Sequence, residues 1–329
     1  MVGPRCSIVV PTHGRSAQLA EALASIAAQR SDDVEVVVVQ DGDRDAGGYA
    51  IARERATAQF GDRLQWLKLT CASHGHGPAA VRNIGAAAAR GNYLGFLDDD
   101  DLWIDEAHVK RVLALLDRDP TIQAVFANQE AVRDGERETV PLWLDTVAHV
   151  ITDTLEADTA YPVTRSLLLR TGGFCHLNTL IVQRALFDQL GGFDESLQYE
   201  EDRDVYMRII DRAERLVYFP LVVARHHVPT NDDPTSASRQ TDDLLKLINR
   251  LRIFDKAVLL GAHADIRRHG RRHKAYTLKS IAERLARTGR LGTATTYARE
   301  ALGLAPTLGW LLYTCRLALS RALRADASG

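Results

Sequence analysis

The chain has 329 residues, of which 46% are hydrophobic and 26% charged, a composition that is typical of a folded globular protein and excludes a disordered one. Its 41 Lys and Arg residues nearly balance its 43 Asp and Glu residues, which argues against a nucleic-acid-binding protein, because such proteins usually carry a basic face. The four cysteines, Cys6, Cys71, Cys175 and Cys315, lie far apart without metal-finger spacing, so we expect reduced thiols in a cytoplasmic protein.

The start of the chain lacks the charged and apolar regions of a signal peptide, so no secretion is expected. Residues 7–10 read as the first strand. Strands are also predicted at 34–39, 64–69 and 93–97, with helices at 19–28, 49–60 and 78–89. This alternation predicts a mainly parallel sheet with crossover helices. The continuously apolar run 34–39 is typical of a strand that is buried on both faces.

A helix over 104–116 and a strand over 124–127 follow, and then residues 130–172 give no clear pattern. Further strands are predicted at 178–182 and 216–219, and helices at 185–190 and 202–211. Pro, Asn, Asp, Ser and Thr cluster at 229–238 and predict a linker. We therefore expect a catalytic α/β domain over 1–230, a linker over 231–240 and an all-helical C-terminal region over 241–329.

The C-terminal region contains one segment, 282–306, that is similar to a single tetratricopeptide-type helix pair. Residues 302–323 are rich in leucine but include a Pro and two Arg, and no apolar run reaches the roughly 20 residues of a membrane helix. We expect these helices to pack on the main domain, with a protein partner or a peripheral membrane contact on the cytoplasmic face as the alternatives.

Four adjacent carboxylates, Asp98 to Asp101, follow the strand predicted at 93–97. Like charges this close together are costly unless a cation holds them. Hard divalent ions such as Mg²⁺ and Mn²⁺ prefer oxygen ligands, and ligand sites in open α/β sheets lie beyond the carboxyl ends of strands. The alternative is an acidic turn that only caps the helix after it.

Seven blocks resemble, in order, those of family 2 glycosyltransferases of the GT-A fold. The blocks are Ser7–Arg15 (SIVVPTHGR), Val36–Asp43 (VVVVQDGD), Ala80–Gly85 (AVRNIG), Tyr93–Trp103 (YLGFLDDDDLW), Arg170–Val182 (RTGGF and NTLIV), Gly191–Glu195 (GGFDE) and Glu201–Arg208 (EDRDVYMR). Each block is short, and their shared order carries the resemblance, which spans residues 7 to about 227. It implies a mixed, mainly parallel GT-A sheet flanked by helices and an enzyme that uses a nucleotide-diphosphate sugar.

The resemblance also implies the donor site. Its nucleotide-binding residues would be Pro11, Thr12, His13, Arg15, Asp41, Arg82, Asp98 and Asp99. Asp41 would accept a hydrogen bond from the base, although an Asp-Gly after a buried strand is also an ordinary turn. His13 departs from the Tyr of many relatives and leaves the choice between UDP- and GDP-linked donors open. Asp100 would bind Mn²⁺ or Mg²⁺, whereas Asp101 is expected to cap the next helix.

Asp202 would be the catalytic base that removes the acceptor hydroxyl's proton, with Glu201 as its neighbouring partner and Glu200 as an alternative. The same Asp could instead be a helix N-cap. Gly173 and Phe174 would line the acceptor side near the donor sugar, or form a turn. His226 and His227 should point opposite ways on an extended segment, so at most one should face the site, and His226 is the expected metal ligand.

These residues favour an inverting hexosyltransferase that moves a sugar to the hydroxyl of a glycan, a lipid carrier or a natural product. Two alternatives remain: a scaffold that binds sugar nucleotides without catalysis, and a nucleotidyltransferase. The loop Pro11–Arg15 lacks the Gly-rich, basic character typical of the latter. A dehydrogenase is disfavoured because the first strand-to-helix turn has no GxGxxG.

Overall fold

The computed structural model describes residues 3–70, 75–138, 144–151, 159–229 and 241–326. The chain divides into two compact units, Met1–Ser236 and Ala237–Gly329, which we call the N-terminal unit and the helical unit. The linker predicted at 231–240 lies outside the described residues. Cys6, Cys175 and Cys315 are free thiols, and Cys71 also lies outside the described part of the chain.

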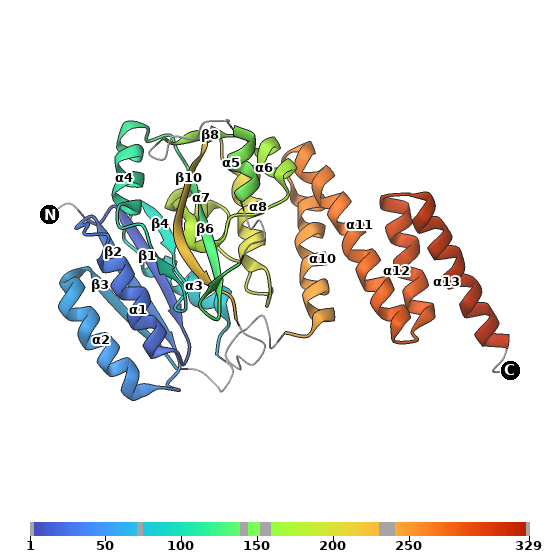
Figure 1. The fold of residues 1–329 in the computed structure, drawn as a ribbon, viewed down its shortest axis with the longest axis horizontal. Coiled ribbons are helices and arrows are strands. Elements are labelled where there is room, and N and C mark those ends of the chain that lie inside the picture. The colour runs from blue at the N-terminus through green and yellow to red at the C-terminus, as the bar shows by residue number, and fades with distance from the viewer. Residues whose placement is uncertain (1–2, 71–74, 139–143, 152–158, 230–240, 327–329) are drawn as a thin grey trace. The chain divides into compact units, whose positions relative to one another are not determined.

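The described residues of the N-terminal unit form a mixed sheet of ten strands (Figure 1). The strands are β1 (Cys6–Thr12), β2 (Val34–Asp41), β3 (Leu64–Leu69), β4 (Tyr93–Phe96), β5 (Leu102–Trp103), β6 (Ala124–Arg133), β7 (Glu136–Arg137), β8 (Tyr161–Val163), β9 (Leu180–Gln183) and β10 (Leu216–His227). Along the sheet their order is β3-β2-β1-β4-β9-β6-β10-β5, with β7 beside β6 and β8 beside β10.

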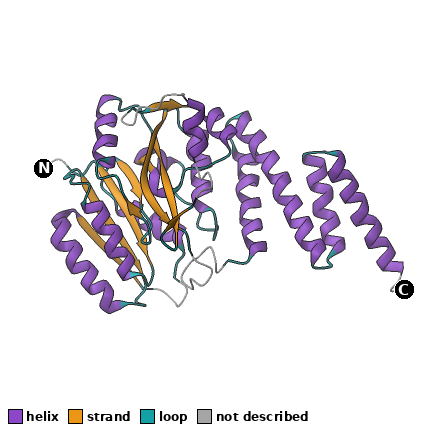
Figure 2. Ribbon diagram, in the orientation of Figure 1, coloured by secondary structure: helices purple, strands orange, loops and turns teal. Residues whose placement is uncertain are grey.

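Helices flank this sheet on both faces (Figure 2). They are α1 (Ser16–Ala27), α2 (Ala46–Phe60), α3 (Pro78–Ala88), α4 (His108–Arg118), α5 (Asp145–Ile151), α6 (Arg165–Thr171), α7 (Arg184–Gln189) and α8 (Glu201–Arg212), with short 3-10 turns at Gly61–Arg63 and Leu177–Thr179. Every residue of β2 is buried, so the prediction of a strand covered on both faces is confirmed.

The strand directions place the site. β3, β2, β1 and β4 are parallel, while β9 pairs antiparallel with both β4 and β6. Since β10 is parallel to β6, β10 runs in the same direction as β1, β2 and β4. The carboxyl ends of these four strands therefore meet at one edge of the sheet, which is where open α/β sheets bind ligands.

The predicted helix over 104–116 starts too early. Leu102 and Trp103 form β5, an edge strand that pairs antiparallel with β10, and α4 begins only at His108. The pairing of Trp103 with Ala224 depends on a strand more than a hundred residues away, so local periodicity could not reveal it. The predicted strands at 124–127 and 216–219 are real, but each continues further, as β6 and β10.

The helical unit contains α10 (Asp243–Leu260), α11 (Ala264–Arg287), α12 (Leu291–Leu304) and α13 (Leu308–Asp326). The predicted helix pair at 282–306 is confirmed as the end of α11 followed by α12. Alanine and leucine side chains of this pair, among them Leu278, Ala282 and Ala298, share one core with Trp310 of α13. Among the described residues no helix is long and apolar enough to span a bilayer.

Candidate active site

Polar side chains follow the carboxyl ends of β1, β2, β4 and β10 at the shared sheet edge. Pro11 pairs with Val39 inside the β1–β2 ladder, and Thr12 ends β1. The Thr12 hydroxyl donates to Asp99 Oδ2 (2.7 Å) and lies 2.9 Å from the Tyr49 hydroxyl. This network ties the loop after β1 to the acidic turn after β4, which the sequence assigned to one nucleotide site.

Asp41 ends β2 with its carboxylate buried. Its Oδ2 accepts the backbone N–H of His76 (2.7 Å), and its Oδ1 lies 2.7 Å from His76 Nδ1. His13 Nδ1 lies 2.5 Å from the Asp41 carbonyl oxygen. Two histidines thus gather around the residue that was predicted to accept from the base. His76 was missed, and its only local signal is its place between two glycines before Pro78.

Gly75 is required for this arrangement. Its φ is +71°, and a Cβ there would lie 2.5 Å from Asp41 Oδ2. We expect Gly75→Ala to destabilise the protein by about 1–2 kcal/mol and to displace His76 from Asp41. Thermal unfolding measures the first effect. Gly47→Ala is the control, because nothing lies within 4 Å of its added Cβ and its φ is ordinary; equal stability losses in both variants would contradict the interpretation.

Arg82, on α3, joins two parts of the site. Its side chain is 7% exposed, and its guanidinium donates to Asp98 Oδ1 (2.5 Å) and to Glu201 Oε1 (2.6 Å). Burial alone would raise the pKa of Asp98, but the charge of Arg82 outweighs it and lowers that pKa to about 2. The sequence placed Arg82 near the nucleotide; the structure shows that it bridges the acidic turn and the start of α8.

The next two carboxylates of the acidic turn respond differently. Burial raises the pKa of Asp99 to about 6, although Arg15 and Thr12 oppose the shift. Burial and the neighbouring charges of Asp101 and Asp99 raise the pKa of Asp100 well above its ordinary value. Arg15 Nη1 lies 2.5 Å from Asp100 Oδ2 and 3.2 Å from Asp99 Oδ1. This part of the turn therefore concentrates negative charge that a cation stabilises.

Asp101 does not cap the next helix, so that prediction is wrong. It is fully buried and accepts from the Asn178 amide and from the His227 backbone N–H (2.8 Å). β5 separates it from α4, whose N-cap is Ala107. Asp101 instead faces the end of β10, which pairs with β5, the strand directly after Asp101.

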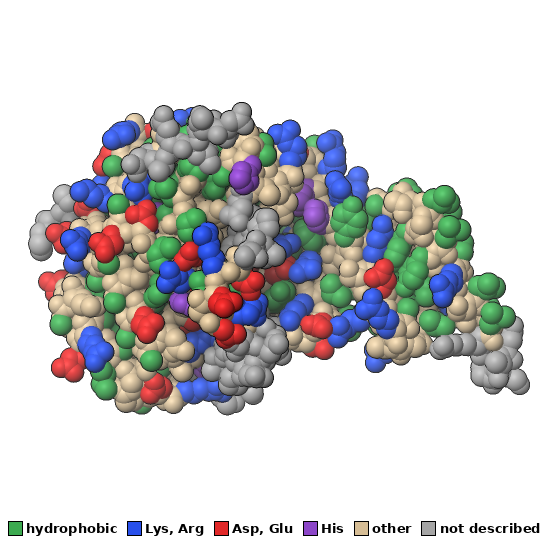
Figure 3. Space-filling view, viewed as in Figure 1, with side chains coloured by type: hydrophobic (Ala, Val, Ile, Leu, Met, Phe, Trp, Pro, Cys, Tyr) green, Lys and Arg blue, Asp and Glu red, His purple; other side chains and the backbone are tan. Residues whose placement is uncertain are grey.

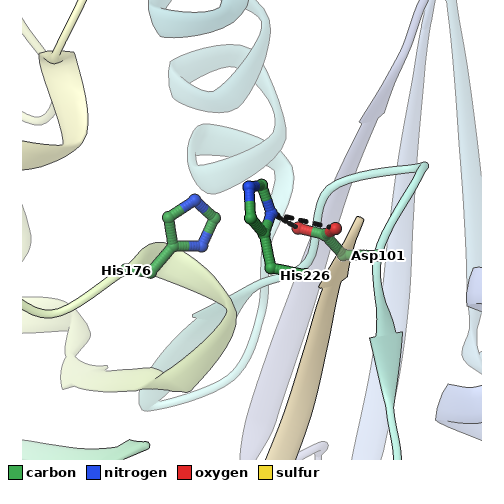
Figure 4. Close-up of side chains that lie close together, drawn as sticks. All are labelled: Asp101, His176 and His226. Carbon is green, nitrogen blue, oxygen red and sulfur yellow. Dashed lines mark hydrogen bonds and ion pairs between the residues drawn. The ribbon is translucent and has the colours of Figure 1, made fainter. Parts of the chain in front are cut away.

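Asp101, His176 and His226 form a cluster whose ligand atoms all lie within 4.8 Å of one another. The His226 ring lies between the other two side chains (Figure 4), with Nδ1 2.9 Å from Asp101 Oδ2 and 4.8 Å between the two imidazole centroids. Burial and the neighbouring His226 lower the pKa of His176 to about 4. Burial opposes protonation of His226, but Asp101 outweighs it and raises its pKa to about 9. One carboxylate and two imidazoles are a donor set that suits divalent transition metals.

Of the two adjacent histidines, His226 belongs to this cluster, whereas His227 contacts the backbone of the acidic turn. His226 contacts the Asp101 carboxylate, and His227 Nδ1 lies 2.6 Å from the Asp100 carbonyl oxygen. The acidic turn closes on itself, with the Asp101 N–H donating to the Asp98 carbonyl (3.1 Å). The turn therefore contacts His226 through the Asp101 carboxylate and His227 through the Asp100 carbonyl oxygen. His176, which completes the cluster, was not predicted.

Asp202 lies in the first turn of α8 but is not its N-cap, since Glu200 holds that place with a left-handed φ of 58°. The Arg203 backbone N–H donates to Asp202 Oδ1 (2.7 Å). Burial and the charges of Glu201 and Glu200 raise the pKa of Asp202 to about 7. A carboxylate with this pKa suits a general base that works near neutral pH.

The loop after α6 packs against the first turns of α8. Gly172 ends α6 in the left-handed conformation, and Gly173 leads to Phe174, whose ring lies 4.6 Å from the Arg203 guanidinium. The ring also lies 6.5 Å from that of Tyr206. Phe174, one of the two predicted acceptor-side residues, therefore contacts the residue that follows the predicted base.

Comparison with known proteins identifies the family of this chain. The model of the family described as Glycosyl transferase family 2 matches residues 7–188, more than half of the chain. An uncharacterized glycosyltransferase of Haemophilus influenzae is 24% identical over 76% of this chain and 80% of its own length. An uncharacterized glycosyltransferase of Rickettsia bellii is 26% identical over 72% of this chain, but the chain spans only 32% of that relative.

Solved structures share the fold. TarS 1–349 of S. aureus in complex with UDP-GlcNAc superposes with a TM-score of 0.65 at 18% identity, covering 90% of this chain and 81% of that one. The mannosyltransferase of Pyrobaculum calidifontis in complex with GDP-Man and Mn²⁺ has a TM-score of 0.59 at 22% identity, covering 98% and 81%. The mixed sheet, its flanking helices and the matched family model together establish that this chain is a glycosyltransferase of family 2 with a GT-A fold.

Proposed function

We propose that this enzyme transfers a sugar from a nucleotide-diphosphate donor to an acceptor hydroxyl with inversion, and that Asp202 is the catalytic base. The observation that carries the proposal is the Arg82 bridge: one buried guanidinium binds both Asp98 of the acidic turn and Glu201, the neighbour of Asp202. A donor held at the acidic turn would therefore lie beside a carboxylate that can accept a proton.

In this proposal the nucleotide occupies the edge formed by β1 and β2. Asp41 accepts a hydrogen bond from the base, and His13 and His76 lie beside it. Thr12, Arg15, Asp98 and Asp99 surround the ribose and phosphates, with Arg15 as the cationic group. Of the two proteins of the same fold, one was solved with UDP-GlcNAc and the other with GDP-Man, so UDP and GDP are the two nucleotides to compare.

The residues of the acidic turn fit a divalent ion, Mn²⁺ or Mg²⁺. Asp100 and His226 would hold it, and Asp101 and His176 lie close enough to add donors. The raised pKa of Asp100 reflects crowding by other carboxylates, which a cation would relieve. When bound, such an ion neutralises charge on the departing diphosphate.

Asp202 would take the proton of the acceptor hydroxyl as the oxygen attacks the anomeric carbon from the face opposite the diphosphate. Glu201, held by Arg82, keeps the start of α8 in place. Phe174 and Arg203 would form the acceptor side. The acceptor itself, a glycan, a lipid carrier or a small natural product, is set by the segments around this loop.

Calorimetric titration of UDP and GDP, with and without Mn²⁺, tests the donor site. We expect metal-dependent binding of one nucleotide and at least an about tenfold weaker Kd in Asp100→Asn. Asp43→Asn is the matched control, because its carboxylate follows the same sheet edge but is half exposed and paired with Lys68. Absence of binding under every metal condition would instead favour a non-catalytic scaffold.

A further inference from the structure

The near balance of charge over the whole chain conceals a strong separation between the two units. Residues 237–329 contain 18 Lys and Arg against 7 Asp and Glu, whereas residues 1–236 contain 23 against 36. The formal charges are thus +11 for the helical unit and −13 for the N-terminal unit. On the visible surface of the helical unit, Lys, Arg and hydrophobic side chains cover more area than Asp and Glu (Figure 3). A basic unit of this kind attracts anionic surfaces.

The same unit carries an exposed apolar face. On α13, Trp310, Thr314 and Leu317 are buried in the helical unit. The opposite side of the helix presents five leucines that are 44–73% exposed: Leu308, Leu311, Leu312, Leu319 and Leu323. We call these residues the leucine stripe. Their spacing of mainly three, four and seven residues keeps them on one face, along about 22 Å of helix.

The N-terminal unit offers no matching surface among its described residues. Its exposed large hydrophobic side chains are Ile51, Ile104, Val150 and Val222, which lie on or beside four different elements. Single exposed apolar residues of this kind are ordinary. Four scattered side chains do not form an apolar surface as long as the leucine stripe. Charge attraction to the N-terminal unit would therefore leave these leucines without an apolar partner.

A second copy of α13 is also an unfavourable partner for the leucine stripe. The ionisable residues of α13, apart from Tyr313 and Cys315, are Arg316, Arg321, Arg324 and, at the last position of the helix, Asp326. Antiparallel pairing of two α13 helices would bring Arg316, near the middle of the helix, towards its own copy without a carboxylate to neutralise it. An anionic surface with an apolar interior can neutralise the arginines and bury the leucines at the same time.

We propose that the helical unit docks on anionic lipid bilayers, with the leucine stripe of α13 inserted at the interface and the basic side chains of the unit facing the lipid headgroups. α13 lies in the plane of the membrane in this arrangement and does not cross it. The proposal does not rest on the proposed reaction, because binding to lipid is measured without a donor or an acceptor.

Vesicle flotation of the full chain tests the proposal. We expect binding to vesicles of phosphatidylcholine containing about one third phosphatidylglycerol, little binding to phosphatidylcholine alone, and weakening at about 0.5 M salt. Leu312→Gln/Leu319→Gln removes apolar area without changing charge and should lower the partition coefficient about 10- to 100-fold. Ile51→Gln/Val150→Gln, which changes two exposed apolar residues of the N-terminal unit, should leave binding unchanged.

Three results would overturn the proposal. One is absence of binding to either vesicle. Another is that the Leu312/Leu319 variant binds the anionic vesicles as well as the wild type does, which would show that the basic unit binds any polyanion. In that case a DNA duplex should displace both proteins from the vesicles equally. The third is a wild-type dimer in sedimentation that becomes monomeric in the variant, which would assign the stripe to self-association. Circular dichroism checks that the variants keep their helices.

Discussion

Replacing Asp202 with Asn should nearly abolish sugar transfer while leaving donor binding intact. General-base catalysis contributes about 10²–10⁴-fold to a rate, and we expect kcat to fall by about that factor in Asp202→Asn because the amide cannot accept the acceptor's proton. The donor Kd should change less than about threefold, since Asp202 lies at the start of α8 and not in the nucleotide edge. Asp188→Asn, which removes an exposed carboxylate on α7, is the matched control. An unchanged kcat in Asp202→Asn would remove this residue from the reaction.

Although Asp202→Asn should lose activity, the raised pKa of Asp202 predicts that the same variant gains stability at neutral and higher pH. The folded-state pKa is about 7, above the ordinary 3.8, so the folded protein binds the proton more tightly and Asp202 destabilises it increasingly as pH rises from about 4 to 7. At pH 8 the Asn variant should therefore be more stable than the wild type, by up to about 4 kcal/mol, because one pKa unit corresponds to about 1.4 kcal/mol. At pH 4 the two should be equal. The rate of the wild type should rise with pH through about 7, because only the ionised carboxylate acts as a base.

The N-terminal half of the site could be predicted because its signals are local. A buried strand such as β2 and a helix with Pro at its first turn, such as α3, are fixed by their own residues. Parallel strands then bring Thr12, Asp41 and Asp98 to one edge without any further information. The order of the family blocks assigned roles to the same residues.

The rest of the site depends on long-range pairing that a single sequence does not display. Asp101 meets His226 only because β10 lies beside β5 and β6, and His176 joins them from a loop before β9. His76 reaches Asp41 through a left-handed Gly75. The opposite charges of the two units nearly cancel in the net charge of the whole chain. They can be counted separately only when the boundary between the units is known.

Arg82→Met should be the most destabilising single change in the site. The guanidinium is buried between two carboxylates, and its removal leaves Asp98 and Glu201 without their cation in a poorly solvated place. Breaking a buried ion pair on one side costs about 3–5 kcal/mol, which corresponds to a Tm lower by about 10 °C for a unit of this size. Calorimetry, which can resolve the two units, measures the shift. Arg30→Met is the matched control: its side chain is 83% exposed and its ion pair to Glu106 is 3.7 Å long, so its cost should stay below about 1 kcal/mol.

A second substitution separates charge from packing at Arg82. If the loss comes from uncompensated carboxylates, Arg82→Met/Glu201→Gln should recover about 1–2 kcal/mol of it, whereas a pure packing defect would give additive losses.

The stability of Arg82→Met relative to the wild type should depend on pH. In the wild type the pKa of Asp98 is lowered to about 2, so its stabilising contribution is complete above about pH 4. Without Arg82 burial dominates and raises that pKa, so the variant should gain stability relative to the wild type as pH falls from 7 to 5. Arg82→Lys should not restore activity, because one ammonium cannot donate to both carboxylates in the planar geometry of the guanidinium; a fully active Lys variant would show that the bridge between donor and base sites is dispensable.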